Sequence, residues 1–166
     1  AVRRIATHLP RVIADLGDLE ARAGMMLGSL YAGLAFSNAI LGAVHAMAHS
    51  LGGLLDLPHG QCNAILLDHV VEYNFSAEPE RYTDLGLAMG ADVSPQAPEQ
   101  ERKQAVLEHL RAFKRQVGAS ATLGELGVTD AHLDSLVDFA LSDPCMLTNP
   151  RTPTAEELRA VYRNAI

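Results

Sequence analysis

Three histidines lie in the most apolar part of this 166-residue chain. His45 and His49 are four residues apart and therefore share one face of a helix. His59 follows directly after Pro58, whose ring favours a turn that can fold the chain back toward the first two. Imidazole is the commonest protein ligand of metals, and burying three such groups costs free energy unless each is paired. The pattern favours a metal site, with hydrogen-bonded core histidines as the alternative.

Two other kinds of chemistry do not fit the sequence. The residue after His45 is Ala46, where the zinc-protease motif His-Glu-x-x-His requires its glutamate base. The phosphate-binding pattern Gly-x-Gly-x-x-Gly does not occur. The two cysteines, Cys62 and Cys145, are far apart and belong to no Cys-x-x-Cys pair, which indicates a reducing, cytoplasmic compartment.

Charge and hydropathy exclude two classes of partner. The chain has 13 basic against 20 acidic residues, so it has no excess of positive charge to neutralise the phosphates of a nucleic acid. Residues 23–55 carry no formal charge and are long enough to span a bilayer. However, this stretch contains the polar residue Asn38 and two histidines. Its several glycines allow helices to pack closely in a protein core. We therefore expect two buried helices here and no membrane span.

The pattern of apolar residues predicts helices along almost the whole chain. No alternating strand pattern is present, so we expect an all-α helical bundle that forms a single domain over residues 1–166. The histidines would lie on a helix over 45–55 and in the turn before a helix over 62–74. A Thr-x-x-Glu capping box at 154–157 is expected to begin the last helix.

A dense set of short motifs surrounds the histidines: Phe36-Ser37-Asn38, Gly42, His45-Ala46-Met47-Ala48-His49, Leu51-Gly52, Pro58-His59-Gly60, Asn63-Ala64-Ile65-Leu66-Leu67 and Asn74. A second stretch near the end reads DPCMLTNPRTPTAEELRAVYRNA. Together these motifs resemble the signature of the iron-containing, or group III, alcohol dehydrogenases. The resemblance covers nearly the whole chain.

The resemblance implies a protein of two parts. In this family an N-terminal α/β part binds NAD(P). A C-terminal all-helical part, which belongs to a dehydroquinate-synthase-like fold, supplies the metal site. The chain resembles the helical part alone, so the nucleotide-binding domain and the first metal-ligand helix are expected to lie outside residues 1–166.

The resemblance also implies roles for individual residues. His45 and His59 would be metal ligands, and His49 would be a catalytic histidine that does not bind the metal. His49 and His59 would lie beside the cofactor. Phe36 and Cys145 would line the substrate pocket.

The complete enzyme implied by the resemblance would use Fe²⁺ (or Zn²⁺) and NAD(P) to interconvert small alcohols and aldehydes or ketones. The family takes its other two ligands from an Asp-x-x-x-His turn, and no aspartate of this chain has a histidine four residues later. We therefore expect the isolated chain to be inactive and to hold metal weakly or not at all.

Two further expectations concern the oligomeric state and an alternative function. The absence of the nucleotide-binding domain would expose an apolar surface, and this surface could drive formation of a homodimer. The alternative function is a stand-alone, non-catalytic helical module for binding or assembly that derives from the same family.

Overall fold

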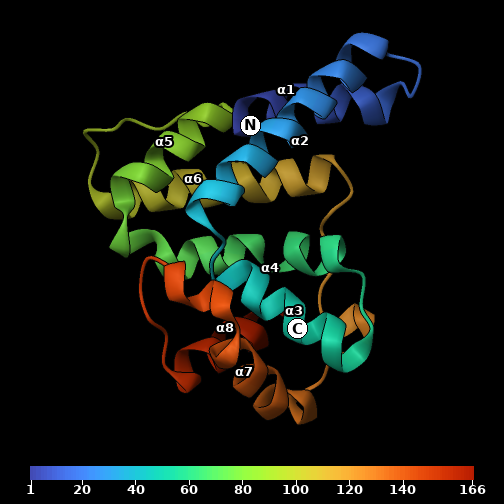
Figure 1. Cartoon of the computed structure of the whole chain (residues 1–166). Helices are drawn as coiled ribbons and strands as arrows, with labels where there is room; N and C mark the ends of the chain where they lie inside the picture. The colour runs from blue at the N-terminus through green and yellow to red at the C-terminus, as the bar shows by residue number, and fades with distance from the viewer. The chain divides into compact units, whose positions relative to one another are not determined.

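The computed structural model describes all 166 residues as eight α-helices and four short 3₁₀ helices, without strands (Figure 1). The fold is therefore all-α, as the sequence predicts. The helices group into two compact units, and the single domain over residues 1–166 stays a prediction. One unit contains residues 1–40 and 78–118, and the other contains residues 41–77 and 119–166. The chain passes between the units at short connections, so no long linker marks the division in the sequence.

The first unit contains α1 (Val2–Ala14), α2 (Leu19–Ala39), α5 (Pro79–Met89) and α6 (Glu99–Gln116). In this unit α1 packs on α2, α5 packs on α6, and α1 also contacts α5. Asp18 caps α2 because its Oδ1 accepts a hydrogen bond from the N–H of Ala21 at 2.9 Å. The charge-free stretch over 23–55 forms two separate helices, and no single helix of the chain is both long and apolar enough to cross a membrane. The expectation of two buried helices holds for α3 (Ala43–Leu55) only, because α2 leaves large apolar side chains such as Met26 and Leu34 exposed.

Close packing between α5 and α6 depends on a glycine. A Cβ atom added at Gly86 would lie 2.6 Å from Cγ2 of Val106, whose side chain is itself buried. We expect Gly86→Ala to lower the free energy of unfolding by about 1–3 kcal/mol, because overpacking forces side chains and backbone apart. Chemical denaturation measures this change. The matched control is Gly33→Ala on α2, where the added Cβ meets nothing within 4 Å. An unchanged stability of Gly86→Ala would contradict the packing described.

The second unit contains the α-helices α3 (Ala43–Leu55), α4 (His59–Asn74), α7 (Leu133–Ser142) and α8 (Ala155–Ala165). Its 3₁₀ helices are η1 (Phe75–Ala77), η2 (Gly124–Leu126), η3 (Asp130–His132) and η4 (Pro144–Thr148). Helix α3 packs against α4, α7 and η4, and α8 packs against α4 and α7. The apolar faces of these helices meet at the contacts and form the buried core of this unit.

One face of α3 is fixed in that core. Met47 and Leu51 are fully buried, and the Tyr162 hydroxyl of α8 donates a hydrogen bond to the carbonyl of Met47 at 2.9 Å. The same hydroxyl lies 2.5 Å from Oγ of Ser50. Burial raises the pKa of Tyr162, so the phenol stays neutral and can donate. This anchorage sets the rotation of α3 and so leaves His45 and His49 partly accessible.

The predicted capping box at the start of α8 is present. Oε2 of Glu157 accepts a hydrogen bond from the N–H of Thr154 at 2.8 Å, and Oγ1 of Thr154 accepts one from the N–H of Glu157 at 3.2 Å. Glu157 also accepts from the Tyr73 hydroxyl at 3.1 Å and pairs with Arg151. The hydrogen bond from Thr154 is the largest cause that holds the pKa of Glu157 below its usual value.

This carboxylate gives stability a defined dependence on pH. Because its pKa is lower in the folded state, the folded chain binds fewer protons than the unfolded chain in acid, and stability falls as the pH falls through this range. The contribution of Glu157 is therefore fully present above the usual pKa and is lost below it. We expect Glu157→Gln to be less stable at neutral pH and to lose less stability on acidification, as measured by denaturation at pH 7 and pH 4. Equal acid dependence in the parent and in Glu157→Gln would contradict this assignment, and Glu156→Gln, the exposed neighbour, is the control.

Candidate active site

The structure brings the three histidines of the sequence motif together in the second unit. His45 and His49 lie one turn apart on α3, and His59 is the first residue of α4. Asp56 is the C-cap of α3 and adopts the left-handed conformation with φ 53° and ψ 34°, and Pro58 is the N-cap of α4. The ring centres are 6.2 Å apart for His45 and His49, 5.5 Å for His45 and His59, and 5.2 Å for His49 and His59. The short turn therefore brings the three imidazole rings close to one another.

The pair His45 and His59 fits a shared metal ion. Zinc-type ions bind imidazole nitrogen at about 2.1 Å, so two rings on one ion have their centres roughly 5 Å apart. The observed separation of 5.5 Å is compatible with this, as is the 5.2 Å between His49 and His59. Burial is the largest cause that lowers the pKa of His45, followed by repulsion from His59 and His49. A lowered pKa keeps the imidazole neutral, which is the form that binds metal.

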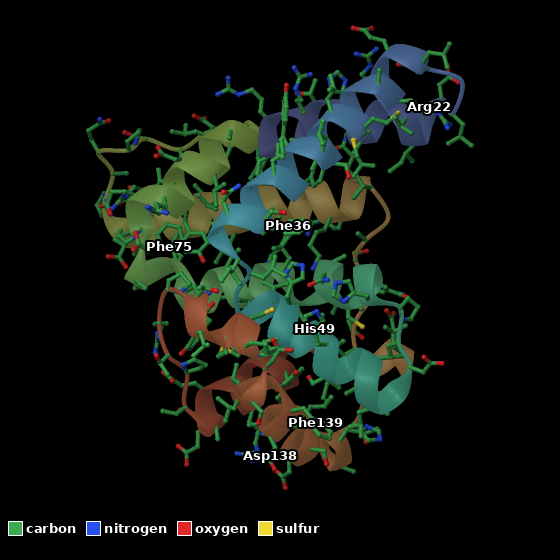
Figure 2. The ribbon with its side chains drawn as sticks, viewed as in Figure 1. Arg22, Phe36, His49, Phe75, Asp138 and Phe139 are labelled. Carbon is green, nitrogen blue, oxygen red and sulfur yellow. The ribbon has the colours of Figure 1, made fainter.

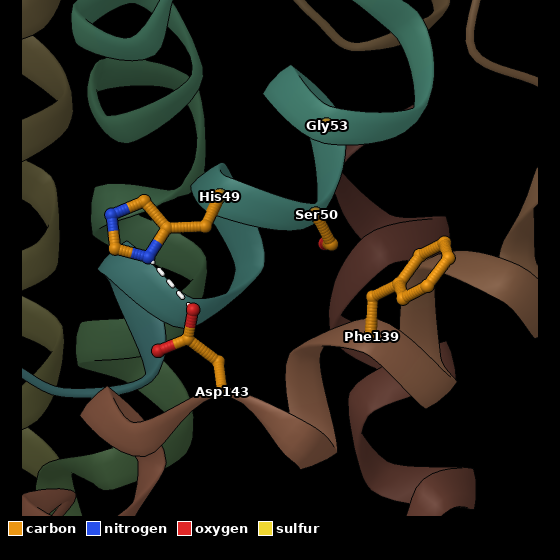
Figure 3. Close-up of a pocket in the computed structure, with 5 residues that line it drawn as sticks. All are labelled: His49, Ser50, Gly53, Phe139 and Asp143. Atoms are coloured by element: carbon orange, nitrogen blue, oxygen red, sulfur yellow. Dashed lines mark hydrogen bonds and ion pairs between the residues drawn. The ribbon is translucent and has the colours of Figure 1, made fainter.

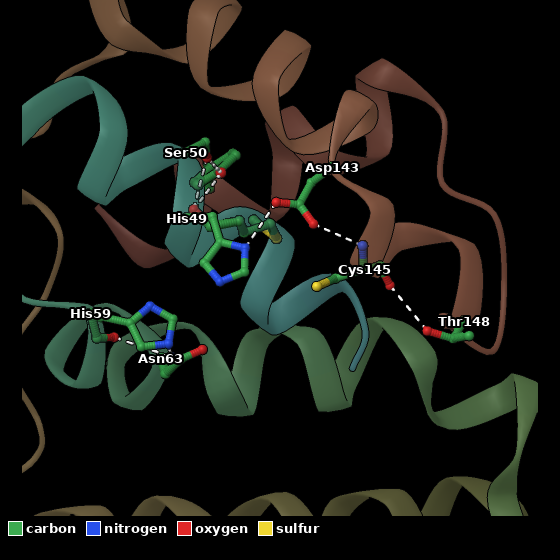
Figure 4. A network of polar contacts seen from close by, with 9 residues as sticks. His49, Ser50, His59, Asn63, Asp143, Cys145 and Thr148 are labelled. Atoms are coloured by element: carbon green, nitrogen blue, oxygen red, sulfur yellow. Dashed lines mark hydrogen bonds and ion pairs between the residues drawn. The ribbon is translucent and has the colours of Figure 1, made fainter. Parts of the chain in front are cut away.

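His59 has one further neighbour, Asn63, one turn along α4. Nδ2 of Asn63 lies 2.9 Å from Nε2 of His59 and donates to the carbonyl of His59 at 3.1 Å (Figure 4). Oδ1 of Asn63 is buried and has no hydrogen-bond partner. This acceptor beside the histidines is therefore not satisfied by protein groups, as expected where a ligand completes a site.

His49 is held by a carboxylate from a distant part of the chain. Oδ2 of Asp143, the residue that follows α7, lies 2.8 Å from Nδ1 of His49 (Figures 3 and 4). Oδ1 of the same carboxylate accepts a hydrogen bond from the N–H of Cys145 at 2.8 Å. Burial alone would raise the pKa of Asp143, but the hydrogen bonds from Cys145 and His49 outweigh it, and the pKa is lowered. Asp143 is therefore ionised at neutral pH.

A second set of potential metal ligands overlaps this pair. Ligand atoms of His49, Asp143 and Cys145 all lie within 4.8 Å of one another. However, His49 and Asp143 already bond to each other, and burial raises the pKa of the Cys145 thiol, which opposes the thiolate that metals bind. We interpret these three residues as a hydrogen-bonded network, and His45 with His59 as the better candidate for metal binding.

A shallow cavity of about 320 Å³ adjoins the histidine and carboxylate pair (Figure 3). It is lined by His49, Ser50, Gly53, Phe139 and Asp143. Neither His45 nor His59 lines it, so the cavity reaches the site only at the end formed by His49.

The structure places the remaining sequence-predicted residues as follows. Cys145 lies beside Asp143, in the first turn of η4. Phe36 belongs to α2 in the first unit, and 49% of its surface is exposed (Figure 2). The roles of both residues in a substrate pocket stay predictions. Sequence reasoning missed Asp143, and the only local signal for it was an aspartate before Pro144, which predicts a helix cap and not a catalytic contact.

Comparison with known proteins gives consistent matches over the chain. The model of the Fe-containing alcohol dehydrogenase family, C-terminal, matches residues 1–166. The chain is 40% identical over 165 residues to 1,3-propanediol dehydrogenase of Klebsiella pneumoniae and 42% identical over 165 residues to lactaldehyde reductase of Escherichia coli K12. Each match covers 99% of this chain and 42% of the relative. The structure of an alcohol dehydrogenase from Oenococcus oeni is similar with a TM-score of 0.93 at 33% identity, over 99% of this chain and 43% of that chain. The chain thus spans less than half the length of these relatives.

Proposed function

Because the chain belongs to the Fe-containing alcohol dehydrogenase family, as the C-terminal part, we propose that it is the helical, metal-binding half of an NAD(P)-dependent dehydrogenase. The reaction would interconvert small alcohols with aldehydes or ketones. The observation that carries the proposal is the convergence of His45, His49 and His59 at the junction of α3 and α4. The names of the two relatives, which specify a propanediol and lactaldehyde, support a small oxygenated substrate.

The roles of the residues follow from their surroundings. His45 and His59 would hold a divalent iron (or zinc) ion, which when bound supplies Lewis-acid polarisation of the substrate oxygen. NAD(P) supplies the hydride chemistry. The resemblance to the family assigns His49 to the substrate and not to the metal, and its Nδ1 is held by Asp143. Its other nitrogen is available to hydrogen-bond the substrate or to move the hydroxyl proton.

Two imidazoles are only half of a four-ligand shell. The other ligands and the nucleotide-binding domain would come from an N-terminal part of the same protein, in line with the 42% of each relative that this chain covers. We therefore propose that residues 1–166 alone are inactive.

The test compares the intact protein that carries this chain with the 166-residue chain alone. Both are supplied with Fe²⁺ or Zn²⁺ under anaerobic conditions, and both are assayed with lactaldehyde and NADH or NADPH. We expect near-stoichiometric metal and turnover in the intact protein, with neither in the chain alone. If the intact protein neither retains metal nor oxidises the nicotinamide, the proposal fails and the non-catalytic module becomes the better explanation. Turnover by the chain alone would overturn its proposed inactivity.

A further inference from the structure

The carboxylate of Asp143 is held in place by hydrogen bonds, by burial and by a restricted backbone. Both of its oxygens have a hydrogen-bond partner at 2.8 Å, His49 on one side and the N–H of Cys145 on the other. Its side chain is 15% exposed, whereas that of His49 is 41% exposed. Pro144 follows directly and begins η4, which restricts the backbone at this point. A largely buried carboxylate in a fixed position therefore accepts a hydrogen bond from a histidine that is exposed to solvent.

The hydrogen bond determines which ring nitrogen of His49 carries a hydrogen. An ionised carboxylate can only accept hydrogen bonds, so Nδ1 of His49 must be the donor. The lone pair of the neutral ring then lies on Nε2. In Figure 4 this second nitrogen points away from Asp143 and toward the side on which His59 lies. The carboxylate thus fixes both the tautomer and the direction of the free nitrogen.

Stability gives little reason for this arrangement. Ion pairs that involve a solvent-exposed side chain contribute about 0–1 kcal/mol. In contrast, a histidine that acts on a substrate must present one defined nitrogen, and a wrong tautomer abolishes this role even when the geometry is intact. The contact joins residues 94 positions apart and orients the one histidine of the three that is not assigned to the metal.

We propose that Asp143 is a positioning residue for the dehydrogenase reaction: it orients the ring of His49 and keeps its hydrogen on Nδ1, so that Nε2 faces the substrate. The inference rests on the proposed function for the chemistry that His49 performs. The orientation and the tautomer themselves rest only on the contacts of Asp143.

The kinetic test uses the intact protein with the isosteric variant Asp143→Asn. We expect kcat to fall at least about 10- to 100-fold, the range known for hydrogen-bond partners of metal-bound histidines, with KM and bound metal nearly unchanged. The matched control is Asp138→Asn, which changes an exposed carboxylate on α7, the helix that precedes Asp143 (Figure 2), and should keep full activity. A kcat of Asp143→Asn equal to that of the parent would overturn the proposal, as would a loss that tracks loss of metal or of folded protein.

A spectroscopic test separates this inference from the proposed function. Nitrogen chemical shifts of ¹⁵N-histidine in the zinc-loaded intact protein report the tautomer of His49, with His49→Gln used to assign the signal. We expect the Nδ1–H form in the parent and a mixture of both forms in Asp143→Asn. An Nε2–H form in the parent overturns the inference without any variant. If the expected tautomer is found but the protein has no turnover, the proposed function fails while the positioning contact stands.

Discussion

Replacing His59 with alanine in the intact protein is expected to remove most of the bound metal and to lower kcat/KM by more than about 100-fold, beyond the range typical of outer-shell substitutions. His45→Ala should have the same effect. The two rings are 5.5 Å apart on α3 and α4, so the loss of either one leaves a single imidazole from this chain. One monodentate ligand cannot replace the chelating pair, and the affinity for the ion falls accordingly.

The readout is metal content by elemental analysis, measured beside thermal unfolding of the metal-free protein. His59 is exposed, so its removal should leave the metal-free melting temperature nearly unchanged. The control is His109→Ala, which removes an imidazole from α6 in the first unit and should retain metal and activity. Full metal occupancy in both His45→Ala and His59→Ala would exclude these residues as ligands, and attention would pass to the set formed by His49, Asp143 and Cys145.

The part of the site that the sequence could predict is the part built from neighbours along the chain. His45 and His49 share a helix face because of their spacing. Pro58 ends the turn that brings His59 back toward these two residues. The sequence also predicts the all-α fold, because helical periodicity is a local property. The helix after the turn differs in one respect: it begins at His59 and not near Cys62, since Pro58 can occupy the position before the first helical turn.

The contacts that could not be predicted join distant segments. Asp143 reaches His49 across 94 residues, and nothing in the spacing of either residue indicates the partner. The same is true of the two packing units, because each is assembled from separate stretches of the chain. Local pattern determines which face of a helix is apolar, but it does not determine which other helix covers that face.

Asn149→Ala is expected to be the most destabilising of the polar substitutions, with a loss of about 3 kcal/mol in the free energy of unfolding. Oδ1 of Asn149 accepts hydrogen bonds from the N–H of Ala43 at 3.1 Å and from Nδ2 of Asn74 at 2.8 Å. Its Nδ2 donates to Oδ1 of Asn74 at 2.9 Å and to the carbonyl of Arg151 at 2.7 Å. One side chain therefore links the start of α3, the end of α4 and the segment before α8, and alanine leaves buried partners unpaired.

A double-mutant cycle with Asn74→Ala decides whether this link is the cause. Each single variant leaves the other amide without its side-chain partner, whereas the double variant removes both amides. We therefore expect the double variant to cost about 1–2 kcal/mol less than the sum of the single changes. Asn38→Ala on α2, whose exposed amide bonds only to the carbonyl of Leu34, should change stability by less than about 0.5 kcal/mol. Strict additivity of Asn74→Ala and Asn149→Ala would contradict the network. Because α3 begins at Ala43, two residues before His45, Asn149→Ala should also weaken metal retention by the intact protein, even though Asn149 touches none of the histidines.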